Sequence, residues 1–315
     1  MPAIIGIYRQ KRRMMAAQPR RSMLQKLQKL FGAKPAEPEP VNGKVTLGDV
    51  LRRNLFELWY QPKIDLRAKR LVGAEALVRA RRPDGSLISP GAFLPGAPEA
   101  DMLALTERVI LTALRDFEDC AAQGAALKLS VNVPASAFVK LPIAQMLREQ
   151  RPKTGNWPGL ILEVTEDEAM HDLKIANEVA DQLRELHCSL ALDDFGTGHS
   201  SLARLRQLPF SELKIDRSYV TNCHIDKVNA GLCETIVELA KRFELKTVAE
   251  GIESAHESHK LQGIGCDIGQ GYLFAKPMPK ETFVDLLGRR MVGAPKQPEK
   301  RATAGTMLRG LFAQT

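Results

Sequence analysis

The sequence predicts an α/β fold, a TIM-type (β/α)8 barrel, on three observations. Short apolar runs alternate with amphipathic stretches over most of the chain, which is the pattern of successive βα units. The region between two tails rich in Pro, Gly and charge has about 250 residues, the usual size of such a barrel. Polar side chains stand at or near the ends of the apolar runs, where a barrel of this class carries its catalytic groups.

The first 43 residues form a segment of their own ahead of the predicted barrel. A basic arm comes first, and Ser22 can cap a short helix whose apolar stripe runs from Met23 to Phe31. The proline-rich stretch from Ala33 to Val41 predicts an extended, mobile linker. We therefore expect three parts, which are the arm and linker at 1–43, one catalytic domain at 44–290 and a flexible tail at 291–315.

Strands and helices are expected to alternate through the catalytic domain. We expect strands near 57–61, 71–77, 127–133, 159–164, 189–193, 211–215, 246–249 and 267–273. We expect helices near 46–54, 101–122, 135–148, 171–187, 200–206, 227–243, 255–262 and 280–289.

Alternation within the runs predicts which side chains point into the barrel, because successive strand side chains face opposite ways. In the run that ends at Asn132, the leucines and Val131 share one face, and the polar residues, including Ser130, share the other. In the run that ends at Asp193, the leucines again face outward, toward covering helices. Asp193 should therefore enter the barrel mouth, and Asp194 should begin the following loop.

The net charge of +8 is a property of the N-terminal arm. Residues 1–34 hold nine Lys or Arg and no acidic residue, and subtracting these nine from the total of 45 leaves 36 basic against 37 acidic residues. The arm has almost no aromatic residues, so specific nucleic-acid binding is not expected. A disordered arm, docking at a membrane surface and a protein partner all remain open.

The five cysteines are widely spaced and show no metal-type pairing, and we expect no secretory leader. No apolar stretch approaches the roughly 20 residues that span a bilayer. We expect reduced thiols and a cytoplasmic location, with peripheral attachment to the inner membrane left open by the basic arm.

Seven polar side chains at or near strand ends are candidates for the chemistry. Six of them are carboxylates or amides, whose hard oxygens are the ligands that Mg2+ or Mn2+ prefers. The adjacent pair Asp193 and Asp194 suits a bridge in a two-metal site, which activates water and clamps an in-line displacement. The seven are Glu75, Asn132, Glu163, Asp193, Lys214, Glu250 and Gln270.

Glu75-Ala76-Leu77, preceded by Tyr60-Gln61-Pro62, resembles the signature of the EAL-domain cyclic-di-GMP phosphodiesterases. The resemblance covers roughly Lys44 to Arg290 and implies a barrel whose first strand runs antiparallel to the rest. The family's further blocks have counterparts in the same order and spacing at Ser130–Asn132, Leu162–Glu166, Asp193–Gly198, Leu213–Ser218, Ala249–Glu253 and Gln270–Phe274.

The resemblance also implies roles for single residues. One metal would be held by Glu75, Asn132, Glu163 and Asp193, and the second by Asp193 and Asp194 with Glu250 close by. The catalytic side chains would be Glu75, Lys214 and Glu250, with Glu250 open as general base or metal ligand. Substrate contacts would come from Gln61, Arg79, Asp216 and Gln270. Control of the loop after Asp193 would involve Glu166, Gly196, Gly198 and Glu253, and would link the site to a dimer interface.

The expected function is metal-dependent hydrolysis of the bacterial second messenger cyclic di-GMP to linear pGpG by a homodimer that uses Mg2+ or Mn2+. One alternative is a receptor module that binds cyclic di-GMP without turnover and signals to a partner. Another is an interaction scaffold that is indifferent to the nucleotide. All the ligands that the resemblance implies are present, which favours the enzyme.

Overall fold

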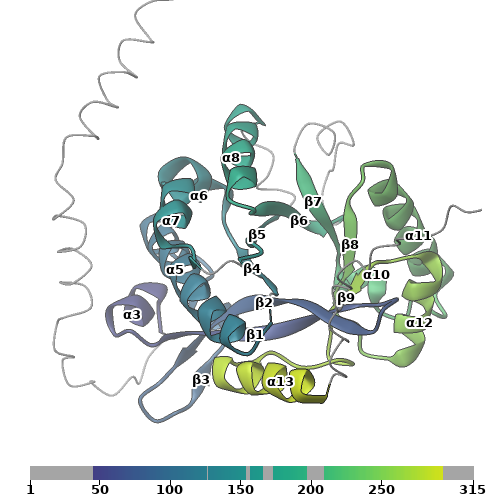
Figure 1. The fold of residues 1–315 in the computed structure, drawn as a ribbon, viewed down its shortest axis with the longest axis horizontal. Helices are drawn as coiled ribbons and strands as arrows, with labels where there is room; N and C mark the ends of the chain where they lie inside the picture. Colours follow the sequence, from purple (N-terminus) through teal and green to yellow (C-terminus); the bar gives the residue numbers. More distant parts are fainter. Residues whose placement is uncertain (1–44, 126, 154–156, 166–172, 197–208, 294–315) are drawn as a thin grey trace, which may run out of the picture.

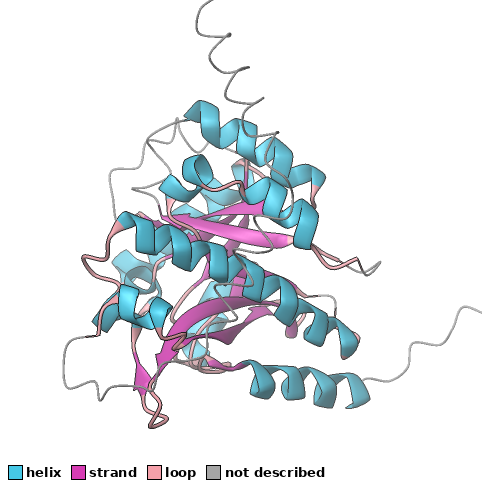
Figure 2. Cartoon of the chain, turned by 90° about the vertical axis from the view of Figure 1, so that its left-hand side faces the viewer, coloured by secondary structure: helices cyan, strands magenta, loops and turns pink. Residues whose placement is uncertain are grey.

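The computed structural model describes residues 45–125, 127–153, 157–165, 173–196 and 209–293, and these form a closed barrel with helices around it (Figures 1 and 2). The order of strands around the barrel is β1-β2-β4-β5-β6-β7-β8-β9, returning to β1. Their bounds are β1 Phe56–Asp65, β2 Arg70–Arg81, β4 Lys128–Asn132, β5 Leu160–Thr165, β6 Ser189–Phe195, β7 Phe210–Ile215, β8 Lys246–Ala249 and β9 Ile268–Gly269.

The first strand is antiparallel to both of its barrel neighbours, β2 and β9, whereas the other neighbouring pairs are parallel. The predicted TIM-type barrel with an antiparallel first strand is therefore confirmed. Two short strands extend the sheet beyond the barrel, β3 (Leu87–Ile88) on β2 and β10 (Met278–Pro279) on β1. In the register between β1 and β2, Gln61 lies opposite Glu75.

The helices lie outside the barrel, and several of them start at a side-chain cap. Thr46 caps α3 and Ser254 caps α12, each in a reciprocal capping box, and the Asp226 carboxylate accepts from two backbone N–H groups at the start of α11. The helices are α3 Leu47–Arg52, α4 Pro90–Phe93, α5 Glu99–Ala122, α6 Ala135–Lys140, α7 Ile143–Gln150, α8 Leu173–Glu185, α10 Arg217–Val220, α11 Lys227–Arg242, α12 Ala255–Ile264 and α13 Lys280–Gly293.

Four expected elements were wrong in extent. The strands expected at 57–61 and 71–77 each continue four residues further, to Asp65 and Arg81. The single helix expected at 135–148 is two helices, because Pro142 lacks an N–H and Leu141 before it is extended, with φ −110° and ψ 143°. The strand expected at 267–273 ends at Gly269. Beyond it the backbone crosses Ile252 so closely that a Cβ at Gly271 would lie 2.1 Å from the Ile252 carbonyl oxygen.

The remaining differences concern short elements and chain ends. β3, β10, α4 and α10 each have two to four residues, too few for a periodic pattern to indicate. Helix α13 continues to Gly293, past the domain boundary expected at residue 290. The arm and linker at 1–43, the helix expected at 200–206 and the tail from residue 294 lie outside the described residues.

The alternation along the strands sorts their side chains as expected. On β4, Leu129 and Val131 are fully buried in the hydrophobic core between strands and helices, and Ser130 is fully buried on the other face. The barrel interior also holds charged groups, of which Lys214 and Glu163 are each only 1% exposed. Within the described part of the chain, no helix combines the length and the apolar character that crossing a membrane requires.

Glu257, in the first turn of α12, accepts hydrogen bonds from two loops at the barrel mouth. Its carboxylate accepts from the backbone N–H groups of Asn222 at 2.9 Å, Glu253 at 3.0 Å and Ser254 at 2.9 Å. Burial by itself raises the pKa of Glu257, but these hydrogen bonds outweigh it and hold the pKa below its ordinary value. The ionised carboxylate therefore joins the loop after α10 to the loop that follows Glu250.

We expect Glu257→Gln to lower the free energy of unfolding at neutral pH by about 1 to 3 kcal/mol, because three N–H groups lose a charged acceptor. The folded pKa is depressed, so this stabilisation is complete above the unfolded pKa of about 4.3 and disappears as the pH falls through the folded value. Urea denaturation at neutral and acid pH measures the difference. The control is Glu238→Gln on the exposed side of α11, and an equal loss in both variants contradicts the assignment.

Candidate active site

The seven candidate residues converge on the interior of the barrel at one end. Two of them lie just beyond short strands and are held by backbone hydrogen bonds that continue the sheet: Glu250 N–H donates to the Ile215 carbonyl at 3.1 Å, and Gln270 N–H donates to the Ala249 carbonyl at 2.8 Å. The other five are Glu75 on β2, Asn132 on β4, Glu163 on β5, Asp193 on β6 and Lys214 on β7.

The Lys214 ammonium lies at the centre of the site. Its Nζ is 2.6 Å from Glu250 Oε1, 2.7 Å from Glu163 Oε2 and 2.9 Å from Asp193 Oδ2, and Glu75 Oε1 lies 3.9 Å away. Burial by itself lowers the pKa of Lys214, but the surrounding carboxylates outweigh it and raise the pKa well above its ordinary value. Lys214 therefore stays a cation and compensates part of the buried negative charge.

Two amides hold the Glu75 carboxylate. Asn132 Nδ2 donates to Glu75 Oε1 at 2.8 Å, and Gln270 Nε2 donates to Glu75 Oε2 at 2.6 Å and to Gln61 Oε1 at 3.0 Å. Gln61 in turn donates to the Ala275 carbonyl at 3.2 Å. The buried Gln270 Oε1 has no hydrogen-bond partner in the described structure, so a polar acceptor is available there for a ligand or water.

The acid groups of the site differ in pKa because their partners differ. Burial raises the pKa of Glu250 to about 8, with Glu75 and Asp193 adding to the rise and Lys214 opposing it. Burial also raises the pKa of Glu75, and the charge on Glu163 adds to this while Lys214 opposes it. Glu163 is also fully buried, but its two lysine partners outweigh burial and hold its pKa well below the ordinary value. Glu75 and Glu250 therefore ionise less readily than Glu163.

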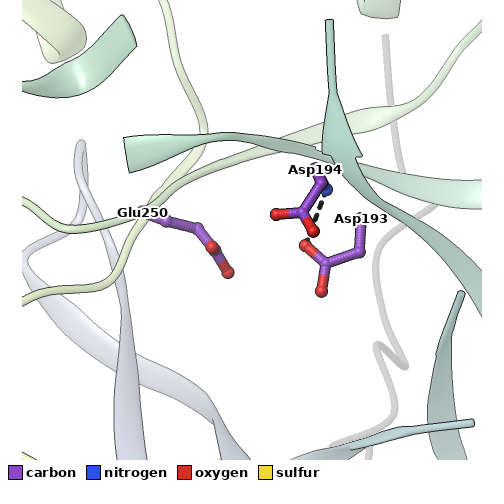
Figure 3. Close-up of side chains that lie close together, drawn as sticks. All are labelled: Asp193, Asp194 and Glu250. Atoms are coloured by element: carbon purple, nitrogen blue, oxygen red, sulfur yellow. Dashed lines mark hydrogen bonds between the residues drawn. The ribbon is translucent and has the colours of Figure 1, made fainter. Parts of the chain in front are cut away.

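Asp193, Asp194 and Glu250 form the group best arranged to hold a cation. Their carboxylates each offer an oxygen within 4.8 Å of the others, and Figure 3 shows the two aspartates side by side with Glu250 facing them. The backbone N–H of Asp194 donates to Asp193 Oδ1 at 2.9 Å, which holds the Asp193 side chain against the Asp194 backbone. Burial raises the pKa of Asp194, and Asp193 and Asp216 add to the rise. A divalent cation would relieve this repulsion.

The residues therefore fit hard divalent cations. Counting Glu212, six carboxylates share the interior with the ammonium groups of Lys63 and Lys214, a formal charge of −4 when all are ionised, which two divalent cations would balance. A cation on the oxygens of Glu75, Glu163 and Asp193 would compete with the Lys214 ammonium, which is paired with the same groups.

The residues expected to contact substrate lie at different depths. Gln61 is buried beside Gln270, as expected for a residue of the same site. Arg79 is partly buried and stacks over the Trp59 ring, with Cζ 5.9 Å from the ring centroid, and its Nη1 donates to the Val78 carbonyl. Asp216 caps α10 by accepting from Ser218 N–H at 2.9 Å. Its observed contacts are thus those of a helix cap.

The structure describes two of the four residues expected to control the loop. The Gly196 carbonyl accepts from the Tyr219 hydroxyl, and Gly196 has φ 94°, where a Cβ would lie 3.0 Å from the Tyr219 ring. Glu253 forms an exposed ion pair with Arg217 at 2.7 Å. Glu166 and Gly198 lie outside the described residues.

Lys63 and Glu212 are buried charges inside the barrel that the sequence analysis missed. Lys63 Nζ lies 2.7 Å from Glu163 Oε1 and 3.7 Å from Glu212 Oε2, and both residues are buried. The period of two along a strand contained the signal, because Lys63 follows Gln61 by two residues and Glu212 precedes Lys214 by two.

The comparisons with known proteins agree with this geometry. The EAL domain family model matches residues 45–277. The bifunctional diguanylate cyclase/cyclic di-GMP phosphodiesterase MucR of Pseudomonas aeruginosa is 37% identical over 76% of this chain and 35% of its own length. The probable cyclic di-GMP phosphodiesterase PdeB of Escherichia coli is 35% identical over 76% of this chain and 46% of its own length. The chain thus spans less than half the length of these curated relatives.

Solved structures match over most of their own length. A structure named as the PaMucR phosphodiesterase in complex with c-di-GMP has a TM-score of 0.69 and 36% identity, over 75% of this chain and 97% of that one. The FimX EAL domain from Pseudomonas aeruginosa, bound to c-di-GMP, has a TM-score of 0.63 and 26% identity, over 74% of this chain and 94% of that one.

We expect Mn2+ to raise the melting temperature of the purified protein, because a ligand that binds only the folded state stabilises it, by about 2.7 kcal/mol at 100 times its dissociation constant. Asp193→Asn should lose most of that shift, since one charged oxygen of the cation group is replaced. Asp285→Asn, at an exposed position of α13, is the control. The two variants are compared by thermal denaturation with and without Mn2+, and an undiminished shift in Asp193→Asn excludes this group as the cation site.

Proposed function

The chain belongs to the EAL domain family, and from that premise we propose that it hydrolyses cyclic di-GMP to linear pGpG with the help of divalent cations. The single observation that carries the proposal is the convergence of Glu75, Glu163, Asp193 and Glu250 on one buried ammonium, beside the Asp193, Asp194 and Glu250 group. The named relatives with cyclic di-GMP phosphodiesterase activity support the choice of substrate.

The cations would be held by two overlapping sets of residues. Asp193, Asp194 and Glu250 would hold one, and Asp193 with Glu75, Asn132 and Glu163 the other. When bound, Mg2+ or Mn2+ supplies a water nucleophile at neutral pH and neutralises charge on the phosphoryl oxygens. The structure supports a site of this composition and leaves the choice between Mg2+ and Mn2+ to the assay.

The protein's own groups would position the phosphodiester and handle the proton. Lys214 would place its positive charge beside the phosphoryl oxygens, where charge builds up during displacement. The raised pKa of Glu250, about 8, suits a carboxylate that takes up a proton near neutral pH, and this supports the role of base beside that of ligand. Gln270 would orient polar ligands through its unpartnered Oε1.

Arg79 would bind a phosphate of the substrate. It lies four residues beyond Glu75 on the same face of β2, about 13 Å further along the strand in the direction of the barrel mouth. Its planar guanidinium suits two parallel hydrogen bonds to phosphate oxygens. Gln61 and Asp216 would complete the substrate contacts, although Asp216 would then act while also capping α10.

A receptor that binds cyclic di-GMP without turnover is the second candidate. It is favoured by structural neighbours named only as EAL domains bound to c-di-GMP. The presence of every expected ligand residue favours the enzyme instead. Detection of pGpG separates the two, because a receptor retains the intact cyclic dinucleotide.

We expect the purified chain to convert cyclic di-GMP to pGpG in the presence of Mg2+ or Mn2+ and to lose this activity with a chelator. Glu75→Ala should lower kcat by at least about 10²-fold while the fold survives, because the lost carboxylate would hold a cation that neutralises charge on the phosphoryl oxygens. Glu118→Ala, at an exposed position of α5, is the matched control. Chromatography of the nucleotides measures product. Full turnover by a folded Glu75→Ala protein would contradict the proposed role of Glu75 as a metal ligand.

The functional unit is proposed to be a homodimer that uses the N-terminal end of α11. Ile225, Val228 and Leu232 form an apolar stripe there, and their exposed fractions are 71%, 70% and 38%. Asn229 joins α11 to α10 by donating to the Ser218 and Thr221 carbonyls, and Tyr219 on α10 donates to Gly196 after the two aspartates. A partner on this stripe would therefore be two contacts away from the cation group.

We expect Val228→Glu to convert a dimer into a monomer and to lower turnover, because a charge placed on an apolar contact surface must be desolvated there. Val139→Glu is the control, since Val139 is an equally apolar residue with 59% exposure on α6. Light scattering during size-exclusion chromatography gives the mass of each variant. Equal masses for the two variants would exclude the apolar stripe at α11 as the dimer contact.

The N-terminal arm lies outside the described residues, and we propose that it docks at a membrane surface or binds a protein partner. Its basic residues suit an anionic membrane surface or an acidic protein partner. A cytoplasmic location likewise stays a proposal.

A further inference from the structure

Lys63 is a fully buried cation that the proposed mechanism does not use. It lies on β1, the antiparallel strand, two residues after Gln61, and only 2% of it is exposed. Its Nζ is 2.7 Å from Glu163 Oε1 and 3.7 Å from Glu212 Oε2. Burying a lysine ammonium costs free energy of desolvation, and only well-placed partners of opposite charge offset that cost.

The contact of Lys63 with Glu163 crosses the barrel interior. β1 and β5 are not neighbours, since β2 and β4 lie between them on one side and four strands on the other. Lys63 therefore reaches across the interior, and Glu212 on β7, a third strand, pairs with its ammonium at 3.7 Å without a hydrogen bond from Oε2. The geometry is fixed by three strands of the closed barrel and involves no loop.

The two oxygens of Glu163 have different cationic partners. Lys63 Nζ donates to Glu163 Oε1 at 2.7 Å, and Lys214 Nζ donates to Glu163 Oε2 at 2.7 Å. Lys214 also contacts Asp193 and Glu250, so Oε2 is the oxygen that faces the cation group. Oε1 is turned away toward Lys63 and Glu212, where no other candidate ligand makes a contact among the described residues.

We propose that Lys63 is a positioning residue, which holds Glu163 by Oε1 so that Oε2 alone is presented to a divalent cation. This inference rests on the proposed function, because it assigns to Glu163 the role of a cation ligand. It goes further in naming the group that decides how Glu163 binds, with one oxygen and in one orientation. Partners of metal ligands commonly act in this way, and their loss costs roughly 10- to 100-fold in metal affinity or activity.

Three roles for Lys63 predict different effects on cation affinity. If Lys63 positions Glu163, its removal weakens Mn2+ binding. If Lys63 acts only through its charge, its removal makes the site more negative, and Mn2+ binds more tightly. If Lys63 serves only the stability of the barrel, its removal lowers the melting temperature, and the affinity of the folded protein for Mn2+ stays unchanged.

The experiment compares Lys63→Met with the unaltered chain and with Lys246→Met. Methionine keeps the length of the apolar stem of lysine and removes the ammonium, and Lys246 is an exposed lysine at the start of β8 that controls for the loss of one charge. A second variant, Lys63→Met with Glu212→Gln, removes both members of the pair and avoids leaving Glu212 as an unpaired buried charge. Mn2+ affinity is measured directly by calorimetric titration, without nucleotide, and hydrolysis of cyclic di-GMP is measured separately.

We expect both Lys63 variants to bind Mn2+ about 10- to 100-fold more weakly than the unaltered chain, and Lys246→Met to bind it as well as the unaltered chain does. Tighter or unchanged binding in the folded Lys63 variants overturns the inference. An unaltered chain that binds Mn2+ but makes no pGpG overturns the proposed hydrolysis alone. An unaltered chain that binds no Mn2+ overturns both.

Discussion

The pairing of one buried ammonium with several buried carboxylates is the interaction on which the rest of the site depends. Lys214 compensates Glu163, Asp193 and Glu250 at hydrogen-bonding distance. Charges inside a protein persist only when they are paired, because their desolvation costs several kcal/mol each. Carboxylates nevertheless outnumber lysines, and burial, with a further contribution from neighbouring carboxylates, raises the pKa values of Glu75 and Glu250. The excess of carboxylates over lysines in the interior thus favours the binding of cations.

The closed barrel makes this concentration of charge possible. Each strand contributes its inward side chains, and the outward ones, such as Leu129 and Val131, pack in the apolar core under the helices. The antiparallel first strand adds Gln61 and Lys63 from the other chain direction, and these contact Gln270 and Glu163. Most residues of the site therefore sit on strands, and Glu250 and Gln270, just beyond strand ends, are held by backbone hydrogen bonds to the neighbouring strands.

Contacts at the barrel mouth connect the site to the outer helices. The Glu257 carboxylate joins the loop after α10 to the loop that carries Glu250. Tyr219 on α10 contacts the Gly196 carbonyl, two residues after Asp194. The apolar stripe at the start of α11 is tied to α10 through Asn229. A surface event at α11 and the geometry of the aspartates are consequently linked by a short series of hydrogen bonds, which is the physical basis for expecting assembly to affect activity.

By itself, the sequence determined the fold class and seven residues that meet at the site, because strand periodicity and the ordered motif blocks are local signals. Its resemblance to the EAL-domain family implied the antiparallel first strand. The sequence also contained Lys63 and Glu212 at the period of two, but local order does not say that a lysine on β1 reaches a glutamate on β5. The tertiary structure alone decided that both oxygens of Glu163 are taken by lysines, that Gln270 has an unpartnered oxygen, and that the last barrel strand stops at Gly269 where the backbone meets Ile252. These facts depend on distances between strands far apart in the chain, which closure of the barrel sets and no sequence spacing encodes.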